Sequence, residues 1–268
     1  MAAVRIFGIV NVTRDSFSDG GRFFAPEAAI AHGERLLADG ADVLDLGGES
    51  THPDAEPVAA DEEIRRLEPV VAALRGLVEL SVDTNKPEVM RAMLAAGVSW
   101  LNDVNGFRDP GALAVAAAAP SSVRFVVMFS RSRTARAERR VAGAAGLLDE
   151  LRAFVAERRD AFAGAGVVAG RLVFDPGMGF FLGRDALPSL VVLKHLGRLA
   201  AAAGPLLVSV SRKSFVGEVT GRPVAERGAG TLAAELWAVR AGAGYVRTHD
   251  VRALRDALAI EAAIEGAP

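Results

Sequence analysis

The sequence contains no cysteine among its 268 residues. Disulfide bridges, thiolate nucleophiles and cysteine-ligated metals are therefore excluded. No apolar run approaches the roughly 20 residues that cross a bilayer, and the N-terminus lacks a basic stretch followed by an uninterrupted apolar one, so we expect no membrane span and no secretory signal. The formal net charge of −2 lacks the basic excess of a general nucleic-acid binder. We expect a cytoplasmic soluble enzyme.

Several common catalytic signatures are also missing. Without an HExxH pattern, a histidine cluster or a GxSxG elbow, the chain lacks the parts of a zinc hydrolase or a serine esterase. Without GxGxxG or a Walker A sequence, it lacks the usual dinucleotide and nucleoside triphosphate signatures. Of its histidines, His32 and His195 fall within helical patterns, whereas His52 follows Ser50 and Thr51 in a predicted loop.

The residues that are present, 51% of them hydrophobic, form short apolar runs, each followed by a longer alanine- and leucine-rich helical pattern. The runs are apolar at successive positions, which is typical of strands buried on both faces of a parallel sheet. The predicted strands are residues 4–10, 42–46, 78–82, 98–101, 123–128, 171–174, 205–210 and 243–247. The predicted helices are residues 26–39, 61–75, 86–96, 110–118, 146–165, 186–202, 230–241 and 251–264.

Eight strand–helix units in a chain near the usual length of about 250 residues favour a closed (β/α)₈ barrel of the TIM type, an α/β fold. An open doubly wound sheet would show the same alternation and stays open as an alternative. Two segments depart from the rhythm and are predicted to be loops, the arginine-rich residues 130–145 and the glycine-containing residues 217–229. Because no Pro/Ser-rich linker divides the chain, we expect one domain over residues 1–268.

Polar or ionisable residues stand at the C-terminal end of every predicted strand except the fifth, which ends at Met128. They are Asn11, Glu49, Ser50, Thr51, Asp83, Asn102, Asp103, Asp175, Ser211, Arg212, Lys213, Arg247 and His249. In a barrel, the C-terminal ends of the strands carry the active site.

These residues fall into two chemical groups. The carboxylates Asp83 and Asp175, with the amide of Asn102, suit the amino-amide edge of a flat heterocycle, because a carboxylate accepts two parallel N–H bonds. General acid–base work by the carboxylate pair stays possible. The second group, Lys213, Arg212, Arg247 and His249, indicates an anion site, such as one for phosphate.

Seven motifs in order then identify a resemblance. The stretches GIVNVTRDSFSDGG, LGGESTHPDA, SVDTNKPEV, LNDVNGF, FDPGMGF, SVSRKSFVG and YVRTHDV, spread over residues 5–258, resemble the dihydropteroate synthase family. The resemblance implies a barrel that uses Mg²⁺ and joins dihydropterin-methyl diphosphate to 4-aminobenzoate, releasing pyrophosphate. It also implies two small-molecule substrates, no nucleic-acid or membrane partner, and a homodimer.

The resemblance implies a role for each matching residue. Asp83, Asn102 and Asp175 would hold the pterin, Lys213 would contact it, and Met128 and Phe180 would pack around its ring. Asn11 would bind the metal and the diphosphate, and Arg247 and His249 would clamp the diphosphate. Ser50 and Thr51 would lie near diphosphate and 4-aminobenzoate, and Phe17 and Ser211 near 4-aminobenzoate. The catalytic roles would fall to Lys213, Asp175, Arg247 and His249, and residues 11–21 would form a flap that closes over substrate.

Four features depart from the family pattern. Arg14 replaces a usual proline, His52 a frequent arginine, Phe129 a frequent histidine, and GMGFFLGRD a loop of the GFGK type. The last resembles the sulfonamide-insensitive branch of the family, whereas the GGEST and SFSDGG stretches resemble ordinary chromosomal enzymes. Two alternatives stay open: a methyltetrahydrofolate:corrinoid methyltransferase, which needs no diphosphate clamp, and a non-catalytic pterin-binding paralogue.

Overall fold

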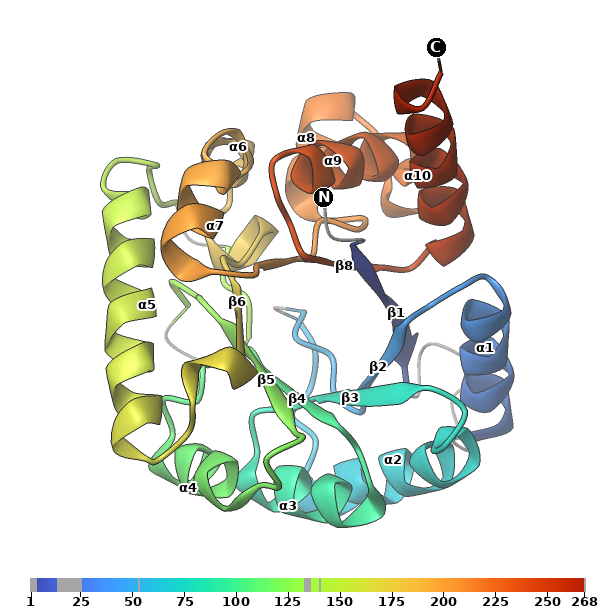
Figure 1. The fold of residues 1–268 in the computed structure, drawn as a ribbon, viewed down its shortest axis with the longest axis vertical. Coiled ribbons are helices and arrows are strands. Elements are labelled where there is room, and N and C mark those ends of the chain that lie inside the picture. The colour runs from blue at the N-terminus through green and yellow to red at the C-terminus, as the bar shows by residue number, and fades with distance from the viewer. Residues whose placement is uncertain (1–3, 14–25, 53, 133–135, 140, 268) are drawn as a thin grey trace.

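The chain forms an eight-stranded parallel barrel surrounded by helices in the computed structural model (Figure 1). The structure describes residues 4–13, 26–52, 54–132, 136–139 and 141–267. The strands are β1 (Arg5–Asn11), β2 (Val43–Gly47), β3 (Glu79–Asp83), β4 (Trp100–Asp103), β5 (Arg124–Met128), β6 (Leu172–Asp175), β7 (Leu207–Val208) and β8 (Tyr245–Thr248).

The helices lie outside the ring of strands. They are α1 (Pro26–Ala38), α2 (Ala60–Leu74), α3 (Pro87–Ala96), α4 (Pro110–Ala118), α5 (Leu147–Gly164), α6 (Ala186–Lys194), α7 (Leu196–Ala203), α8 (Ser214–Thr220), α9 (Gly228–Arg240) and α10 (Val251–Glu265). Short 3₁₀ turns cover Ala169–Arg171, Gly179–Phe181 and Val224–Glu226.

The strand order decides between the two predicted architectures. Neighbouring strands pair in the order β6-β5-β4-β3-β2-β1-β8-β7, without the reversal of an open doubly wound sheet. A parallel bridge between Phe174 and Leu206 joins the two ends of the sheet. The (β/α)₈ barrel is therefore confirmed, and each strand lies within two residues of its predicted bounds.

The barrel interior is filled by a layer of aromatic and aliphatic side chains. Phe7, Trp100 and Tyr245 meet edge to face, with ring centroids 5.1–5.9 Å apart. Because strand side chains alternate between the two faces, the residues two and four positions further along point inward as well. The period of two therefore brings Asp45, Asn102 and Arg247 to the inside, above the aromatic layer and toward the C-terminal end of the strands.

Two predicted elements were wrong. The helix predicted over residues 186–202 is two helices, which meet at His195 with an angle of 64°. The bend lets α6 pack against α8 and α7 against α5. The loop predicted over residues 217–229 includes the end of α8 and the start of α9. Gly217 lies inside α8, and the Arg227 guanidinium packs so closely on it that a Cβ at this position would lie 2.2 Å away.

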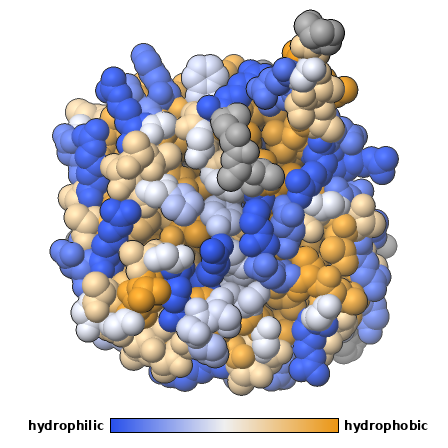
Figure 2. Space-filling view, viewed as in Figure 1, coloured by the Kyte–Doolittle hydropathy of each residue, from blue (hydrophilic) through white to orange (hydrophobic). Residues whose placement is uncertain are grey.

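The outer surface mixes polar and apolar residues. Figure 2 shows hydrophilic residues spread over the face seen in Figure 1, with apolar residues in separate patches between them. Within the part of the chain that the structure describes, no single helix combines the length and apolar character needed to cross a membrane; only the bent α6–α7 pair meets that test, by length and composition alone.

Candidate active site

A cavity of about 550 Å³ lies at the C-terminal ends of the strands. Nine of the residues that the resemblance assigns to the site line it: Asn11, Ser50, Thr51, Asp83, Phe180, Ser211, Lys213, Arg247 and His249. Glu49 and Arg212, also predicted at strand ends, line it as well. Asn102, Met128 and Asp175 do not line it and are buried at the ends of β4, β5 and β6. The structure thus brings together residues from positions 11 to 249 of the sequence, as the barrel prediction requires. Phe17, Arg14 and the rest of the predicted flap beyond Thr13 lie outside the described residues.

Arg247 joins carboxylates from two other strands. Its Nε donates to Asp45 Oδ2 at 2.5 Å and its Nη2 donates to Asp83 Oδ2 at 2.9 Å. Asn102 Nδ2 donates to the same Asp45 oxygen at 3.2 Å. Arg247 therefore joins members of both chemical groups predicted from the sequence, because Asp83 contacts it directly and Asn102 shares its partner Asp45. This is possible where the inward faces of β2, β3, β4 and β8 meet above the aromatic layer.

Burial governs the protonation of this network. Burial raises the pKa of Asp83 to about 7, because the negative charge of Asp45 adds to the effect and Arg247 only partly offsets it. Arg247 is the group that favours the ionised form of Asp83.

The pKa values of Asp175 and Lys213 shift in opposite directions for the same reason, burial. Burial raises the pKa of Asp175 to about 6, although its Oδ1 accepts the Gly177 N–H at 2.7 Å. Burial and the nearby charge of Arg247 lower the pKa of Lys213 to about 8. Each group loses hydration that favours its charged form, so each has more to gain from a ligand that supplies hydrogen bonds.

His249 differs from the cation predicted from the sequence. Burial and the charges of Arg212, Arg247 and Lys213 lower its pKa to about 3, so the ring is neutral at physiological pH. Ser211 Oγ accepts the backbone N–H of His249 at 3.2 Å and lies 2.9 Å from Nδ1. The hydroxyl hydrogen can then go to Nδ1, which leaves Nε2–H as the donor of the ring.

Apolar side chains form one wall of the cavity. Ala137, Phe180 and Phe181 line the cavity, and Met128 and Val104 belong to the same apolar cluster without lining it. The Arg139 guanidinium lies 5.7 Å from the centre of the Phe180 ring. Flat apolar and aromatic surfaces of this kind favour binding of a planar ring.

Three of the four departures from the family pattern lie in the described residues: His52, Phe129 and the GMGFFLGRD stretch that contains Phe180 and Phe181. Phe129 is buried and packs edge to face on Phe154, as a packing residue would. His52 lines the cavity, and its Nδ1 lies 3.3 Å from the backbone N–H of Asp54 and 3.7 Å from the carboxylate of the same residue.

The sequence analysis missed two residues of this region. Asp45 is fully buried inside β2, and its position within the apolar run VLDLG was the available signal, because a lone buried carboxylate needs partners. Ser214, at the start of α8, lines the cavity, and its Oγ has no hydrogen-bond partner among the described residues. No sequence pattern singled it out from its neighbours in SVSRKSF.

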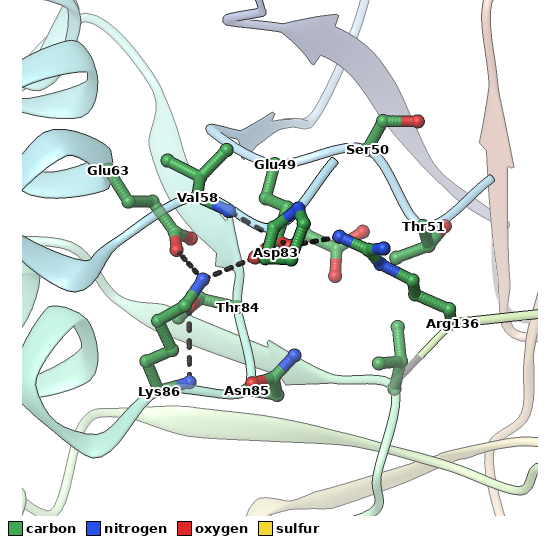
Figure 3. Close-up of a pocket in the computed structure, with 12 residues that line it drawn as sticks. Glu49, Ser50, Thr51, Val58, Glu63, Asp83, Thr84, Asn85, Lys86 and Arg136 are labelled. Carbon is green, nitrogen blue, oxygen red and sulfur yellow. Dashed lines mark hydrogen bonds and ion pairs between the residues drawn. The ribbon is translucent and has the colours of Figure 1, made fainter. Parts of the chain in front are cut away.

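A second cavity of about 350 Å³ adjoins the first and shares Glu49, Ser50, Thr51 and Asp83 with it. Figure 3 shows Lys86 between Glu63 and Glu49, with Arg136 reaching Glu49 from the other side. Lys86 Nζ is bonded to both carboxylates.

The described residues include no group of three or more His, Asp or Glu side chains arranged to hold a metal ion. Asn11, the metal ligand implied by the resemblance, is exposed at the end of β1 and lines the larger cavity. Its amide oxygen is the kind of hard ligand that Mg²⁺ prefers. A single such ligand fits an ion that keeps several waters and takes its remaining ligands from substrate phosphates.

Comparison with known proteins gives a consistent result. Residues 7–249 match the family model described as pterin binding enzyme. The dihydropteroate synthase type-2 of Escherichia coli is 49% identical over 262 residues, which cover 97% of this chain and 96% of that protein.

Solved structures extend the comparison to the fold. A Xanthomonas albilineans dihydropteroate synthase with 4-aminobenzoic acid is 44% identical, has a TM-score of 0.90, and is matched over 100% of this chain and 95% of that one. The same enzyme in complex with 7,8-dihydropteroate is 41% identical with a TM-score of 0.86, again over 100% and 95% of the two chains.

Proposed function

The chain belongs to the dihydropteroate synthase family of pterin-binding enzymes, a family of transferases in folate biosynthesis, and we propose that it joins (7,8-dihydropterin-6-yl)methyl diphosphate to 4-aminobenzoate. The products are 7,8-dihydropteroate and pyrophosphate. The observation that carries this proposal is one cavity in which buried carboxylates, Lys213, Arg247 and His249 converge. A pterin-binding barrel over residues 1–268 and a cytoplasmic location are parts of the same proposal.

The pterin would bind at the buried polar groups. Its amino-amide edge offers N–H donors to Asp175, and charge-assisted pairs of this kind are strong. Asp45 Oδ1 and Asn102 Oδ1 are buried without a partner among the described residues. Two buried acceptors without donors favour a ligand rich in N–H groups, because an unsatisfied buried acceptor costs about 1–3 kcal/mol. Met128 and Phe180 would pack around the ring.

The diphosphate would bind where positive charge and N–H donors meet. Arg247 offers a guanidinium, His249 its Nε2–H, and Lys213 an ammonium group close to both. Relatives in this family use a divalent metal ion, and we propose Mg²⁺ with Asn11 as its protein ligand. When bound, such an ion supplies positive charge to the diphosphate oxygens.

The 4-aminobenzoate would lie beside Thr51, Ser50 and Ser211, with Phe17 from the flap. The Ser214 hydroxyl, which has no protein partner in the described part of the chain, is suited to its carboxylate. The amine would then face the pterin methylene carbon.

The reaction needs little proton transfer by the protein. The bond between the methylene carbon and the diphosphate oxygen breaks, and its electron pair leaves with pyrophosphate. The dihydropterin ring delocalises the positive charge that remains on the carbon. The amine nitrogen forms the new C–N bond and loses one proton, which balances the charge. Arg247, Lys213 and the His249 N–H stabilise the departing charge, so positioning and electrostatics dominate.

The aromatic pair Phe180–Phe181 leads us to propose, in addition, that the enzyme is insensitive to sulfonamides. Phe180 and Phe181 both line the cavity, and Phe181 is almost fully buried. A rigid aromatic wall beside the 4-aminobenzoate position would exclude a bulkier sulfonamide and admit the smaller substrate. The test is to measure the inhibition constant of a sulfonamide together with the KM for 4-aminobenzoate. A sulfonamide that binds as tightly as 4-aminobenzoate would contradict the proposal.

The proposed activity is tested with the purified protein, the pterin diphosphate, 4-aminobenzoate and Mg²⁺, by measuring dihydropteroate and pyrophosphate together. Equal amounts of both products are expected. Transfer of a methyl group from methyltetrahydrofolate would instead favour the methyltransferase alternative. Failure to complement a folate-auxotrophic strain, with no product in vitro, would favour the non-catalytic alternative.

A further inference from the structure

In the loop between β2 and α2, the side chain of Glu49 accepts hydrogen bonds from three separate segments. Its Oε2 is bonded to Lys86 Nζ, from the segment that follows β3. Its Oε1 accepts from Arg136 Nη2 at 3.3 Å and from the Val58 backbone N–H at 3.3 Å. One carboxylate thus receives donors from the β3 end, from the β5–α5 segment, and from the far end of its own loop (Figure 3).

The chain places Ser50 and Thr51 directly after this residue. Both line the large cavity, and both also border the smaller one. The β5–α5 segment contacts the loop at two further points. Ala137 N–H donates to the Thr51 carbonyl at 3.1 Å, and Arg139 pairs with both oxygens of Asp54 at 2.9 and 2.6 Å. Thr51 is therefore held between the Glu49 bonds on one side and the Ala137 bond on the other.

The charge of Glu49 can be removed without leaving a neighbouring buried charge unpaired. Glu63 is fully buried on α2 and bonded to Lys86 Nζ at 2.5 Å, and its Oε1 has no partner in the described part of the chain. Removing Lys86 would leave this carboxylate buried and unpaired, which is strongly destabilising. Removing the charge of Glu49 leaves the Lys86–Glu63 pair intact, and Arg136, which is 27% exposed, can turn to water.

Glu49 is charged when the protein is active. Burial raises its pKa, but the hydrogen bonds from Lys86 and Arg136 outweigh burial, so the pKa of Glu49 lies below its ordinary value. Its bonds are therefore charge-assisted, which makes them stronger than those of a neutral side chain.

We propose that Glu49 is a positioning residue that sets Ser50 and Thr51 against 4-aminobenzoate, and that Arg136 acts on the substrate only through Glu49. The inference rests on the proposed roles of Ser50 and Thr51. Glu49 itself does no chemistry on substrate. Its three bonds join the β2 loop to the segments after β3 and β5, so that the loop presents its hydroxyls at a fixed place.

The test is Glu49→Gln, which keeps the shape and removes the charge. The KM for 4-aminobenzoate should rise about tenfold, because a misplaced Thr51 loses a hydrogen bond to the substrate and one such bond is worth about a tenfold change in affinity. The kcat at saturating substrate should change less than about twofold, since the groups that stabilise departing pyrophosphate are elsewhere. Hydrogen exchange should speed up in residues 49–58 and stay unchanged in α2, with a Tm within a few degrees of the parent.

The matched control is Asp54→Asn in the same loop. Its partner Arg139 is 49% exposed and Asp54 is 62% exposed, and pairs of this kind contribute little. Its KM should stay within about twofold of the parent. A second variant, Arg136→Gln, should raise the KM less than Glu49→Gln does. The double variant should behave like Glu49→Gln alone, because both residues act through one carboxylate.

Thr51→Val separates the inference from the function on which it rests. If Thr51→Val raises the KM for 4-aminobenzoate and Glu49→Gln does not, the positioning role is wrong and the proposed site stands. If neither variant changes it, the site assignment of the loop falls together with the inference. The inference would also be overturned if Glu49→Gln raised the KM for 4-aminobenzoate and Thr51→Val did not. The same holds if Asp54→Asn raised this KM as much as Glu49→Gln does, or if the effects of Glu49→Gln and Arg136→Gln on it were additive.

Discussion

At the scale of single residues, the candidate site is built from charges that the fold holds away from water. Asp45 is fully buried, Asp175 is 4% exposed, and Lys213 has its pKa lowered to about 8 by burial. The raised pKa of Asp175 and the lowered pKa of Lys213 mean that each of these two charges lowers the stability of the protein without substrate, because desolvation of a charge is unfavourable. We infer that these charged side chains favour substrate binding and lower the folding stability.

Asp175→Asn is therefore expected to stabilise the protein and abolish most activity. The asparagine can still accept the Gly177 N–H, but it has no charge to desolvate. Because the pKa of Asp175 is raised from 3.8 to about 6, the folded form binds the proton more tightly than the unfolded chain. The aspartate thus lowers stability at pH 8 by about 2–3 kcal/mol.

The sign of this effect fixes its pH dependence. The stability gained by Asp175→Asn is complete above about pH 6 and shrinks as the pH falls from 6 toward 3.8, below which the aspartate is protonated in the folded and in the unfolded protein. Urea unfolding of the two proteins at pH 8 and pH 4 measures it. A variant less stable than the parent at pH 8, or one that keeps its affinity for the pterin diphosphate, would contradict the assigned role.

Arg247→Gln should have the opposite effect on stability. Asp45 and Asp83 would lose the guanidinium that they share, and removing one partner of buried charges costs about 3–5 kcal/mol. Arg240→Gln is the matched control, because its pair with Glu261 lies at the surface and should contribute less than about 1 kcal/mol. Urea unfolding curves compare them. Equal losses in the two variants would show that the buried network does not depend on Arg247.

The sequence predicted the residue types of the site better than their partners. Asp83, Asp175 and Arg247 were recognisable because they end apolar strands. That Arg247 would bridge Asp45 and Asp83 depends on the registers of β1, β2, β3 and β8, which no local pattern contains. The neutral state of His249 depends on burial and on the charges of Arg212 and Lys213, which the fold brings from the end of β7, besides that of nearby Arg247. It therefore could not be predicted from the local sequence.

At the scale of elements, the position of each strand follows from apolar patterning, whereas the breaks between helices follow from tertiary contacts. No proline next to His195 indicates the α6–α7 bend in the sequence. It arises where the two helices pack on different neighbours, α8 for one and α5 for the other. Trp237 Nε1 donates to the Leu193 carbonyl at the end of α6, so this carbonyl has a hydrogen-bond partner where the helix ends.

The loop after β6 requires glycine at position 177. Its φ is +70°, and a Cβ there would lie 2.3 Å from the Phe129 carbonyl oxygen. Gly177→Ala should destabilise the protein by about 1–3 kcal/mol, through strain and a clash with backbone that cannot move aside. It should also weaken pterin binding, since the Gly177 N–H is bonded to Asp175.

Gly164→Ala is the control for this substitution. Gly164 lies at the end of α5 with nothing within 4 Å of the added Cβ. This change should stabilise the protein by about 0.5–1 kcal/mol, because alanine loses less chain entropy than glycine in a helix. Thermal unfolding and pterin binding are measured for both variants. A Gly177→Ala protein as stable as Gly164→Ala would mean that the loop adopts another conformation.

At the scale of the whole molecule, the barrel leaves an apolar face on neighbouring helices. Leu187 and Leu190 on α6, Val219 on α8, and Trp237 on α9 are 41–61% exposed, and these three helices contact one another. Large apolar residues gathered on one side of a molecule often mark an interface. A two-fold dimer through this face would bury the same residues from both copies, which is the arrangement we propose for the homodimer.

Trp237→Glu tests this dimer. The parent protein should sediment at twice the 28.0 kDa mass of the chain, and the variant at the mass of one chain, because a buried unpaired carboxylate at an isologous interface occurs twice. Val168→Glu, an equally exposed change in the turn before β6, should leave the mass unchanged. Tm values of both variants separate dissociation from unfolding. A monomeric parent, or a Trp237→Glu protein that stays dimeric while folded, would place the homodimer interface elsewhere or remove it. Since all the residues proposed to contact substrate come from a single chain, a dissociated and folded variant should retain its turnover per chain.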